Sequence, residues 1–98
     1  MARFLIPVGS VVRLGDESEL VIVGYGRISP SEPDVLYDYF GYPYPEGVSA
    51  GGGGFGFNDE AVDTILHMGY MSPEQRMQAD SIRERMDAFR LAHAGEDT

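Results

Sequence analysis

Cysteine, lysine and tryptophan are all absent from this sequence. Without cysteine the chain can form neither a disulfide nor a thiolate metal site, and the redox state of its compartment is left open. The 7 basic residues are all arginines and face 16 acidic residues, which gives a formal charge of −9. Such an acidic surface repels phosphate backbones and anionic lipid heads, so we expect neither nucleic acid nor a membrane as a partner.

Long apolar runs are also missing. The apolar run at residues 4–6 ends at Pro7 and is too short for a signal peptide, and no later run approaches the length of a membrane span. We therefore expect a cytoplasmic protein. The 98 residues suffice for one hydrophobic core without disulfides, so we predict a single domain over residues 1–98.

Residues suited to catalysis are few. The chain has 2 histidines and no nucleophilic cysteine, no serine lies in a nucleophile elbow, and no pair of carboxylates stands out as an acid and a base. We therefore predict that the protein is not an enzyme and has no catalytic residue, no cofactor and no metal site.

The most specific stretch is the tyrosine-rich and proline-rich segment 37–47, which holds four of the 6 tyrosines. Over residues 35–40 the side chains follow the period of two that is typical of a β-strand with one partly polar face. Pro43 and Pro45 then end the strand and favour extended geometry for Tyr42 and Tyr44, so we predict a stiff aromatic arm leaving the sheet. This arm is either a packed corner of the core or a recognition surface.

Two apolar, β-branched runs precede this arm. Residues 10–14 and 19–25 are separated by Gly-Asp-Glu-Ser, which predicts a β-hairpin. The second run is apolar on both faces around residues 20–23 and so becomes the central strand. With the strand at 35–40 it forms a three-stranded antiparallel meander, because the connections are too short for crossover helices. The sheet and the aromatic arm together occupy residues 7–47.

Residues 48–57 form a connection with four consecutive glycines. The connection lacks the lysine of a phosphate-binding loop, and the acidic Asp59 and Glu60 that follow already occupy the positive end of the next helix dipole. We therefore predict a flexible loop rather than a nucleotide site, with Phe55 and Phe57 fixing its far end to the core.

A first helix is predicted over residues 58–69. Asn58 is a suitable N-cap, and apolar residues recur after it at helical spacing: Ala61, Val62, Ile65 and Leu66. The opposite face carries three polar residues whose spacing suits either a solvated surface or a divalent metal: Glu60, Asp63 and His67.

A second helix is predicted over residues 73–93, with a frayed tail at 94–98. Ser72 and Pro73 supply an N-cap and a proline at the first position. One stripe faces the core: Ala79, Ile82, Met86, Phe89 and His93. On the solvated face, ion pairs are predicted at i, i+4 spacing: Arg76 with Asp80, and Arg83 with Asp87.

Met77 and Leu91 lie on a different side of this second helix, in a weaker apolar stripe. The stripe is either a chance arrangement or a contact for a protein partner or for a second copy in a homodimer. The predicted fold is therefore α+β: a three-stranded antiparallel β-meander followed by two α-helices, one of them packed on the sheet.

Three blocks of the sequence carry a resemblance. They are residues 7–12 leading into the hairpin, residues 37–41 with Tyr-Pro-Glu-Gly at 44–47, and Phe-Asn-Asp-Glu at 57–60. In this order they resemble the bacterial family catalogued as domain of unknown function 4176, although the long glycine run and the lack of lysine depart from its pattern. The resemblance implies a small cytoplasmic accessory protein, encoded beside type VII secretion genes, that binds a large LXG-type toxin before export.

The leading hypothesis is thus a non-catalytic adaptor or chaperone with a protein client. Its contact residues are predicted to be Tyr42, Tyr44, Pro45, Glu46, Gly47, Met77 and Leu91. An immunity protein that blocks the active site of a basic toxin is the alternative, and a small metal-binding domain or enzyme is the third hypothesis.

Overall fold

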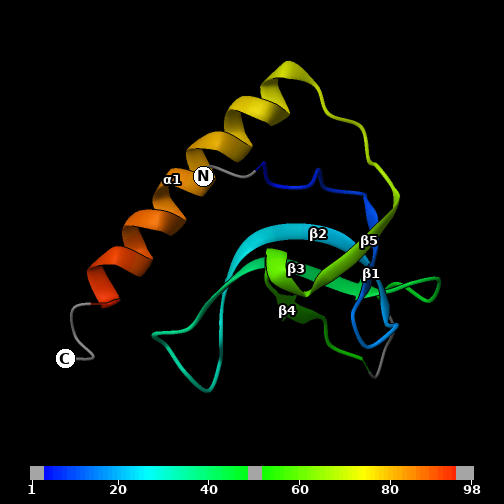
Figure 1. The fold of residues 1–98 in the computed structure, drawn as a ribbon, viewed down its shortest axis with the longest axis horizontal. Coiled ribbons are helices and arrows are strands. Elements are labelled where there is room, and N and C mark those ends of the chain that lie inside the picture. Colours follow the sequence, from blue (N-terminus) through cyan, green and yellow to red (C-terminus); the bar gives the residue numbers. More distant parts are fainter. Residues whose placement is uncertain (1–3, 49–51, 95–98) are drawn as a thin grey trace.

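The computed structural model describes residues 4–48 and 52–94 (Figure 1). Its elements in chain order are β1 (Val11–Leu14), β2 (Glu19–Ile28), β3 (Leu36–Pro43), β4 (Phe55–Phe57), the 3-10 helix η1 (Asp59–Ala61), β5 (Val62–His67) and α1 (Pro73–Ala94). The strands form one antiparallel sheet in the order β4-β3-β2-β1-β5. β2 is therefore the central strand, and β4 and β5 are the edges.

The predicted α+β arrangement of a three-stranded meander followed by two helices is wrong. β1, β2 and β3 are adjacent, but the sheet continues to five strands, and α1 is the one α-helix among the described residues. Residues 58–69, predicted to be helical, contain η1 and the edge strand β5, and the predicted loop 48–57 ends in β4. Residues 49–51 of that loop and residues 95–98 of the predicted tail lie outside the described residues.

β5 is a strand because β1 supplies its hydrogen-bonding partner. The two strands pair antiparallel, with Val12 opposite Ile65, and the Gly15 N–H donates to the Ala61 carbonyl at 3.1 Å. Two register shifts interrupt this pairing. A strand with such irregularities loses the strict period of two, so its apolar residues imitate helical spacing.

The core lies around Tyr39, on the face of the sheet against which Ala79 and Met86 of α1 pack. We call this face the inner face. The Tyr39 ring is fully buried, stacks on Phe57 at a centroid distance of 5.3 Å and meets Tyr25 edge-on at 5.9 Å. Large aromatic side chains dominate the energetics of cores of this size. The buried apolar residues are Leu5, Val12, Leu20, Ile22, Leu36, Tyr39, Phe57, Ala79 and Met86.

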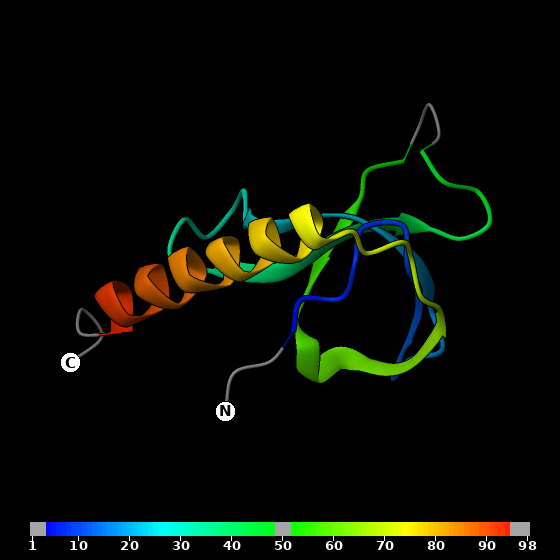
Figure 2. The same cartoon turned by 90° about the horizontal axis from the view of Figure 1, so that it is seen from above.

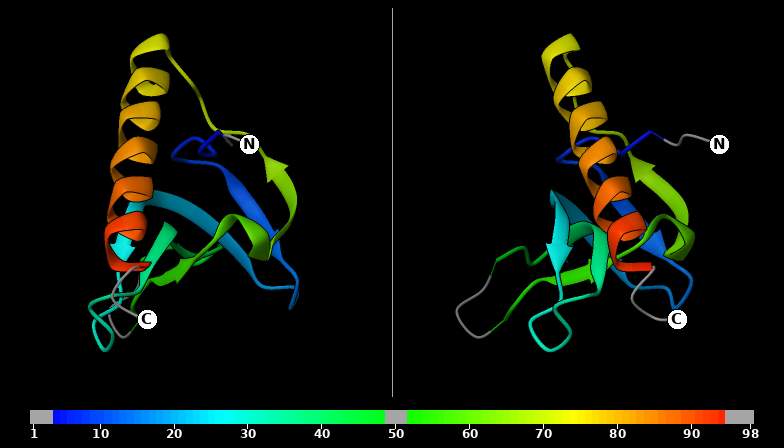
Figure 3. Two further views of the ribbon diagram at one scale, coloured as in Figure 1. Left: turned by 60° about the vertical axis from the view of Figure 1, so that its left-hand side comes forward. Right: turned by 90° about the vertical axis from the view of Figure 1, so that its left-hand side faces the viewer.

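α1 occupies the range in which the second helix is predicted. Its start is capped, because Ser72 Oγ accepts the Gln75 N–H at 3.0 Å and Pro73 takes the first helical position. The helix lies across one side of the sheet (Figure 3), where Ala79 and Met86 are buried. Within the described residues, no helix has the length and apolar character needed to cross a membrane.

α1 covers only one end of the inner face. Its C-terminal half lies near the start of β3, where Arg90 donates to the Leu36 carbonyl at 2.6 Å. The turn after β3 lies at the other end of the sheet, away from α1 (Figures 1 and 2). The inner face is therefore covered by helix at one end and not at the other.

Candidate functional site

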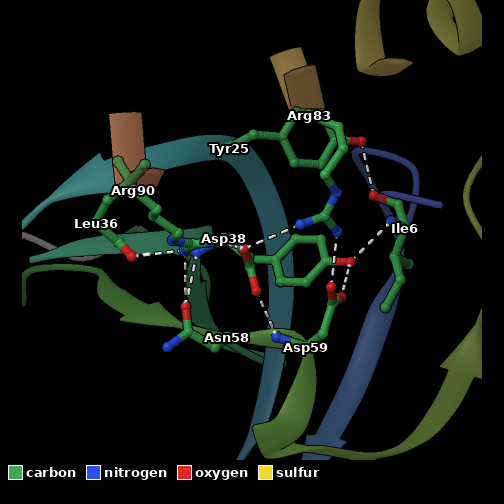
Figure 4. Close-up of polar contacts among 9 residues, drawn as sticks. Ile6, Tyr25, Leu36, Asp38, Asn58, Asp59, Arg83 and Arg90 are labelled. Atoms are coloured by element: carbon green, nitrogen blue, oxygen red, sulfur yellow. Dashed lines mark hydrogen bonds and ion pairs between the residues drawn. The ribbon is translucent and has the colours of Figure 1, made fainter. Parts of the chain in front are cut away.

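Two arginines of α1 reach two aspartates at the sheet (Figure 4). Arg83 donates from Nη1 to Asp38 Oδ1 at 3.2 Å and from Nη2 to Asp59 Oδ2 at 2.7 Å, and Arg90 Nη1 donates to Asp38 Oδ1 at 2.7 Å. Asp38 lies on β3 and Asp59 on η1, and their side chains are only 4% and 11% exposed. We name these four residues the ion-pair cluster.

The remaining carboxylate oxygens of the ion-pair cluster are also paired. Asp38 Oδ2 accepts the Asp59 N–H at 2.8 Å, and Asp59 Oδ1 accepts the Tyr39 hydroxyl at 2.5 Å. The Asp38 N–H in turn donates to Asn58 Oδ1 at 2.9 Å. Every carboxylate oxygen thus has a donor, and the two positive charges balance the two negative ones. The cluster fastens α1 to the sheet.

Tyr39 and Arg83 titrate outside their ordinary ranges. Burial raises the pKa of Tyr39, and the hydrogen bond that it donates to Asp59 raises this pKa further. Burial by itself lowers the pKa of Arg83, but the hydrogen bond and the charge of Asp59 outweigh it and raise this pKa overall. Tyr39 therefore remains a neutral donor, and Arg83 remains a cation.

The ion-pair cluster was not predicted from the sequence. The Arg76–Asp80 pair is present at 3.6 Å, but within the described residues Arg83 pairs with Asp38 and Asp59 and not with Asp87 as predicted. The sequence does suggest that both charges are buried, because Arg83 stands beside the apolar stripe of the helix and Asp38 stands within an apolar strand. It does not show that they pair with each other, since the two residues are far apart in the chain.

A groove of about 450 Å³ lies at the other end of the inner face. Its apolar lining consists of Leu14, Leu20, Pro43 and Phe55, with the backbone of Gly56 beside them. Its polar lining consists of Asp16, Ser18, Glu19, Tyr44 and Glu46. We name this depression, which includes no residue of α1, the acidic groove.

The strand register explains why these residues meet. Leu20 lies opposite Pro43, and Gly41 lies opposite Phe55, so the ends of β2, β3 and β4 come together. The turn between β1 and β2 adds Asp16, and the turn after β3 adds Glu46. The groove is therefore built by two turns that border the uncovered end of the core.

The carboxylates of the acidic groove differ in their pairing. Glu19 forms an ion pair with Arg13 at 3.1 Å. Asp16 accepts the Ser18 N–H at 3.0 Å, which lowers the pKa of Asp16 and keeps it ionised. Within residues 4–48 and 52–94, no ion pair involves Asp16 or Glu46. These two carboxylates therefore leave the groove with a net negative charge.

The structure places only part of the predicted aromatic arm in the acidic groove. Tyr44 and Glu46 line it, whereas Tyr42 belongs to β3 and packs edge-on against Phe40 at 5.4 Å. The prediction of an extended arm is wrong. The Gly47 N–H donates to the Pro43 carbonyl at 2.6 Å, and Gly47 has a φ of +69°, so the chain turns back.

Pro45 and Gly47 shape this turn but do not line the acidic groove. Met77 and Leu91 are 72% and 78% exposed on α1, a helix that contributes nothing to the groove. The structure thus separates the predicted contact residues into two surfaces. Apart from Tyr44 and Glu46, the sequence analysis predicted none of the lining residues as contacts: Leu14, Asp16, Ser18, Glu19, Leu20, Pro43, Phe55 and Gly56. The acidic turn before Glu19 was their one visible signal.

The hypothetical metal ligands do not share a helix face. Glu60 lies in η1, and Asp63 and His67 lie on β5. In the part of the chain that the structure describes, no three histidine or acidic side chains group closely enough to hold a metal ion. The spacing that suggested a metal depended on the helix that does not form.

Comparison with known proteins gives one match. The model of a family described as domain of unknown function, DUF4176, matches residues 5–77. The chain belongs to this family. No curated protein and no solved structure matches the chain. The DUF4176 match spans all five strands and the acidic groove, and it ends in the first turns of α1, before Arg83 and Arg90.

Proposed function

We propose that this DUF4176 protein is a non-catalytic, protein-binding accessory factor that holds a client through the acidic groove. The groove itself is the observation that carries the proposal. Tyr44 and Phe55 are 51% and 55% exposed there, beside the carboxylates of Asp16 and Glu46. Half-exposed aromatic side chains in a concave surface are typical of the central contacts in protein interfaces.

For the client, we propose a toxin of the LXG type that is exported by type VII secretion, with the chain acting as its cytoplasmic adaptor or chaperone. This part of the proposal rests on the sequence resemblance. The acidic groove supports it by offering a surface that can hold a client segment and keep it from aggregating before export.

The non-catalytic part of the proposal is supported by the ion-pair cluster. It holds the most buried carboxylates of the described chain, on Asp38 and Asp59, and all their oxygens accept hydrogen bonds from protein donors. A general acid or base must instead exchange its proton with a substrate. The cluster has a sufficient structural role in fastening α1.

Co-expression with the LXG-type toxin encoded nearest the gene tests the proposal. The complex is purified and its mass is determined by size exclusion with light scattering. We expect a complex of defined stoichiometry that Tyr44→Ala combined with Glu46→Ala weakens at least tenfold. Tyr70→Ala is the matched control, because Tyr70 is 84% exposed and does not line the groove. A complex that tolerates the groove variant as well as the control contradicts the proposal.

Toxin activity distinguishes an adaptor from an immunity protein. An adaptor changes the solubility or export of the toxin and leaves cells sensitive to toxin that is already folded. If this chain instead protected cells from the activity of the toxin that they express, the immunity role would be assigned.

The mass of the chain purified without a client also tests the homodimer, with Met77→Ala and Leu91→Ala as the variants that should return a dimer to a monomer.

A further inference from the structure

The lining of the acidic groove leaves apolar surface exposed to water. Leu20 is buried and Leu14 packs against the core, but Phe55 and Tyr44 keep about half of their surface in water. A side chain placed between them would remove apolar surface from water without moving the core. The groove therefore favours a ligand with at least one apolar group.

The charge of the acidic groove adds a second requirement. Asp16 and Glu46 come from two different turns, and no cation in the described residues is paired with either. A purely apolar ligand would displace water from the two carboxylates without giving them a positive partner, which costs free energy. An acidic ligand would be repelled by them. A ligand with a cation beside its apolar group satisfies both the lining and the charges.

A second groove shows what the charge contributes. A depression of about 400 Å³ is lined by Phe4, Leu5, Ile6, Pro7, Ile65, Met68 and Met71, with no acidic residue among them. It is close in volume to the acidic groove, but it offers nothing that selects a basic ligand. If apolar burial alone decided binding, both grooves would take the same peptides.

We infer that the acidic groove binds a short client segment in which an apolar side chain is flanked by arginine or lysine. A volume of about 450 Å³ suits a few side chains of an extended segment rather than a folded element. Guanidinium and ammonium groups reach Asp16 and Glu46 while the apolar side chain contacts Phe55 and Tyr44. The inference rests on the proposed function, because it names the chemistry of the client segment.

Fluorescence anisotropy with three labelled synthetic peptides tests this inference on the full chain. One peptide carries leucine between two arginines, the second has glycine in place of the leucine, and the third has glutamates in place of the arginines. We expect the first to bind at least tenfold more tightly than either of the others. We also expect its affinity to fall with rising salt, because the carboxylates face solvent.

A charge-matched pair of variants locates the site. Asp16→Asn with Glu46→Gln removes two charges from the acidic groove, and the asparagine can still accept the Ser18 N–H. Glu84→Gln with Asp87→Asn removes two charges from the exposed face of α1. We expect the groove variant to lose at least tenfold in affinity for the first peptide and the helix variant to lose less than twofold.

Three outcomes overturn the inference. They are no binding of the first peptide at millimolar concentration, an equal loss in both variants, and amide shift changes on titration that map to Met68 and Met71 rather than to Leu14 and Phe55. Capture of the client is measured in parallel. A client that is captured while the peptide fails refutes the segment chemistry alone, whereas failure of both refutes the proposed function.

Discussion

Tyr39 links the apolar core to the ion-pair cluster through a single hydroxyl. It donates to Asp59 at 2.5 Å and accepts the Ile6 N–H at 3.1 Å, and its ring is fully buried. A raised pKa in the folded state means that the folded protein holds this proton more tightly than the unfolded chain. The stabilisation is complete below the ordinary tyrosine pKa of 10.0 and is lost as pH rises through the folded pKa.

The first prediction follows from this proton. Between about pH 9 and pH 11.5, the free energy of unfolding of the protein should fall more steeply than that of Tyr39→Phe, by about 1.4 kcal/mol per pH unit above 10. Urea denaturation at each pH measures it. Tyr70→Phe is the control and should follow the unmodified chain, since Tyr70 is 84% exposed. Parallel curves for Tyr39→Phe and the unmodified protein would contradict the prediction.

Neighbouring glycines in the glycine-rich stretch have different roles. A Cβ on Gly54 would lie 2.4 Å from Phe40 Cζ and 2.8 Å from the Gly41 carbonyl oxygen, whereas a Cβ on Gly53 meets nothing within 4 Å. We predict that Gly54→Ala destabilises the protein by about 1–3 kcal/mol through overpacking. Gly53→Ala should be neutral or stabilise by up to about 1 kcal/mol. Equal thermal unfolding midpoints for the two variants would disprove this difference.

At the scale of elements, local spacing predicted α1 and the adjacency of β1, β2 and β3, but it failed for β5, whose structure depends on a distant strand. α1 has its own cap and stripe, beginning at Ser72 and Pro73, and it lies where the sequence placed it. β5 has apolar residues that fit either a helix or an irregular strand. What decides between them is the pairing of Ile65 with Val12, more than fifty residues earlier in the chain. No local pattern contains that information.

The ion-pair cluster gives the prediction for α1. Arg83→Met removes a cation shared by Asp38 and Asp59 but keeps the apolar part of the side chain. We expect a loss of about 2–4 kcal/mol in the free energy of unfolding, because two nearly buried carboxylates lose a donor. Arg85→Met on the same helix is the matched control, since Arg85 is exposed, and it should change stability by less than about 0.5 kcal/mol.

Urea denaturation followed by helical circular dichroism measures both arginine variants. A cycle of Arg83→Met and Asp59→Asn, alone and together, separates the pair from other effects. The double variant should lose less than the sum of the two single variants. Additive losses would mean that Arg83 and Asp59 do not stabilise the fold through their contact.

At the scale of the whole molecule, the sequence indicated only two of the residues that line the acidic groove. Tyr44 and Glu46 stand out because tyrosine, proline and glycine concentrate around them. Asp16 and Phe55 become their neighbours only when the sheet curves and brings two turns together. The net charge of −9 was visible at once, but which carboxylates remain unpaired depends on the fold. A binding surface made from several loops is therefore the feature least accessible to pattern analysis.

The DUF4176 match ends at residue 77, yet residues beyond it complete this molecule. Ala79 and Met86 cover the inner face, and Arg83 and Arg90 balance the buried aspartates. We predict that a chain of residues 1–77 loses cooperative unfolding and amide dispersion in its nitrogen–proton correlation spectrum. The truncation uncovers part of the core and leaves two carboxylates uncompensated. These losses are together comparable with the stability of about 5–15 kcal/mol of a typical domain, so the truncated chain should not keep a stable fold.

Two additions to the truncation experiment decide what α1 contributes. A synthetic peptide of residues 78–94, added in excess, should restore dispersion to the chain of residues 1–77 if packing and charge balance are what was lost. The full chain with Met77→Ala and Leu91→Ala should remain folded, because those side chains are exposed. A dispersed spectrum for residues 1–77 alone would show that the sheet is stable without its helix, and the ion-pair cluster would then be an accessory to the fold rather than a condition of it.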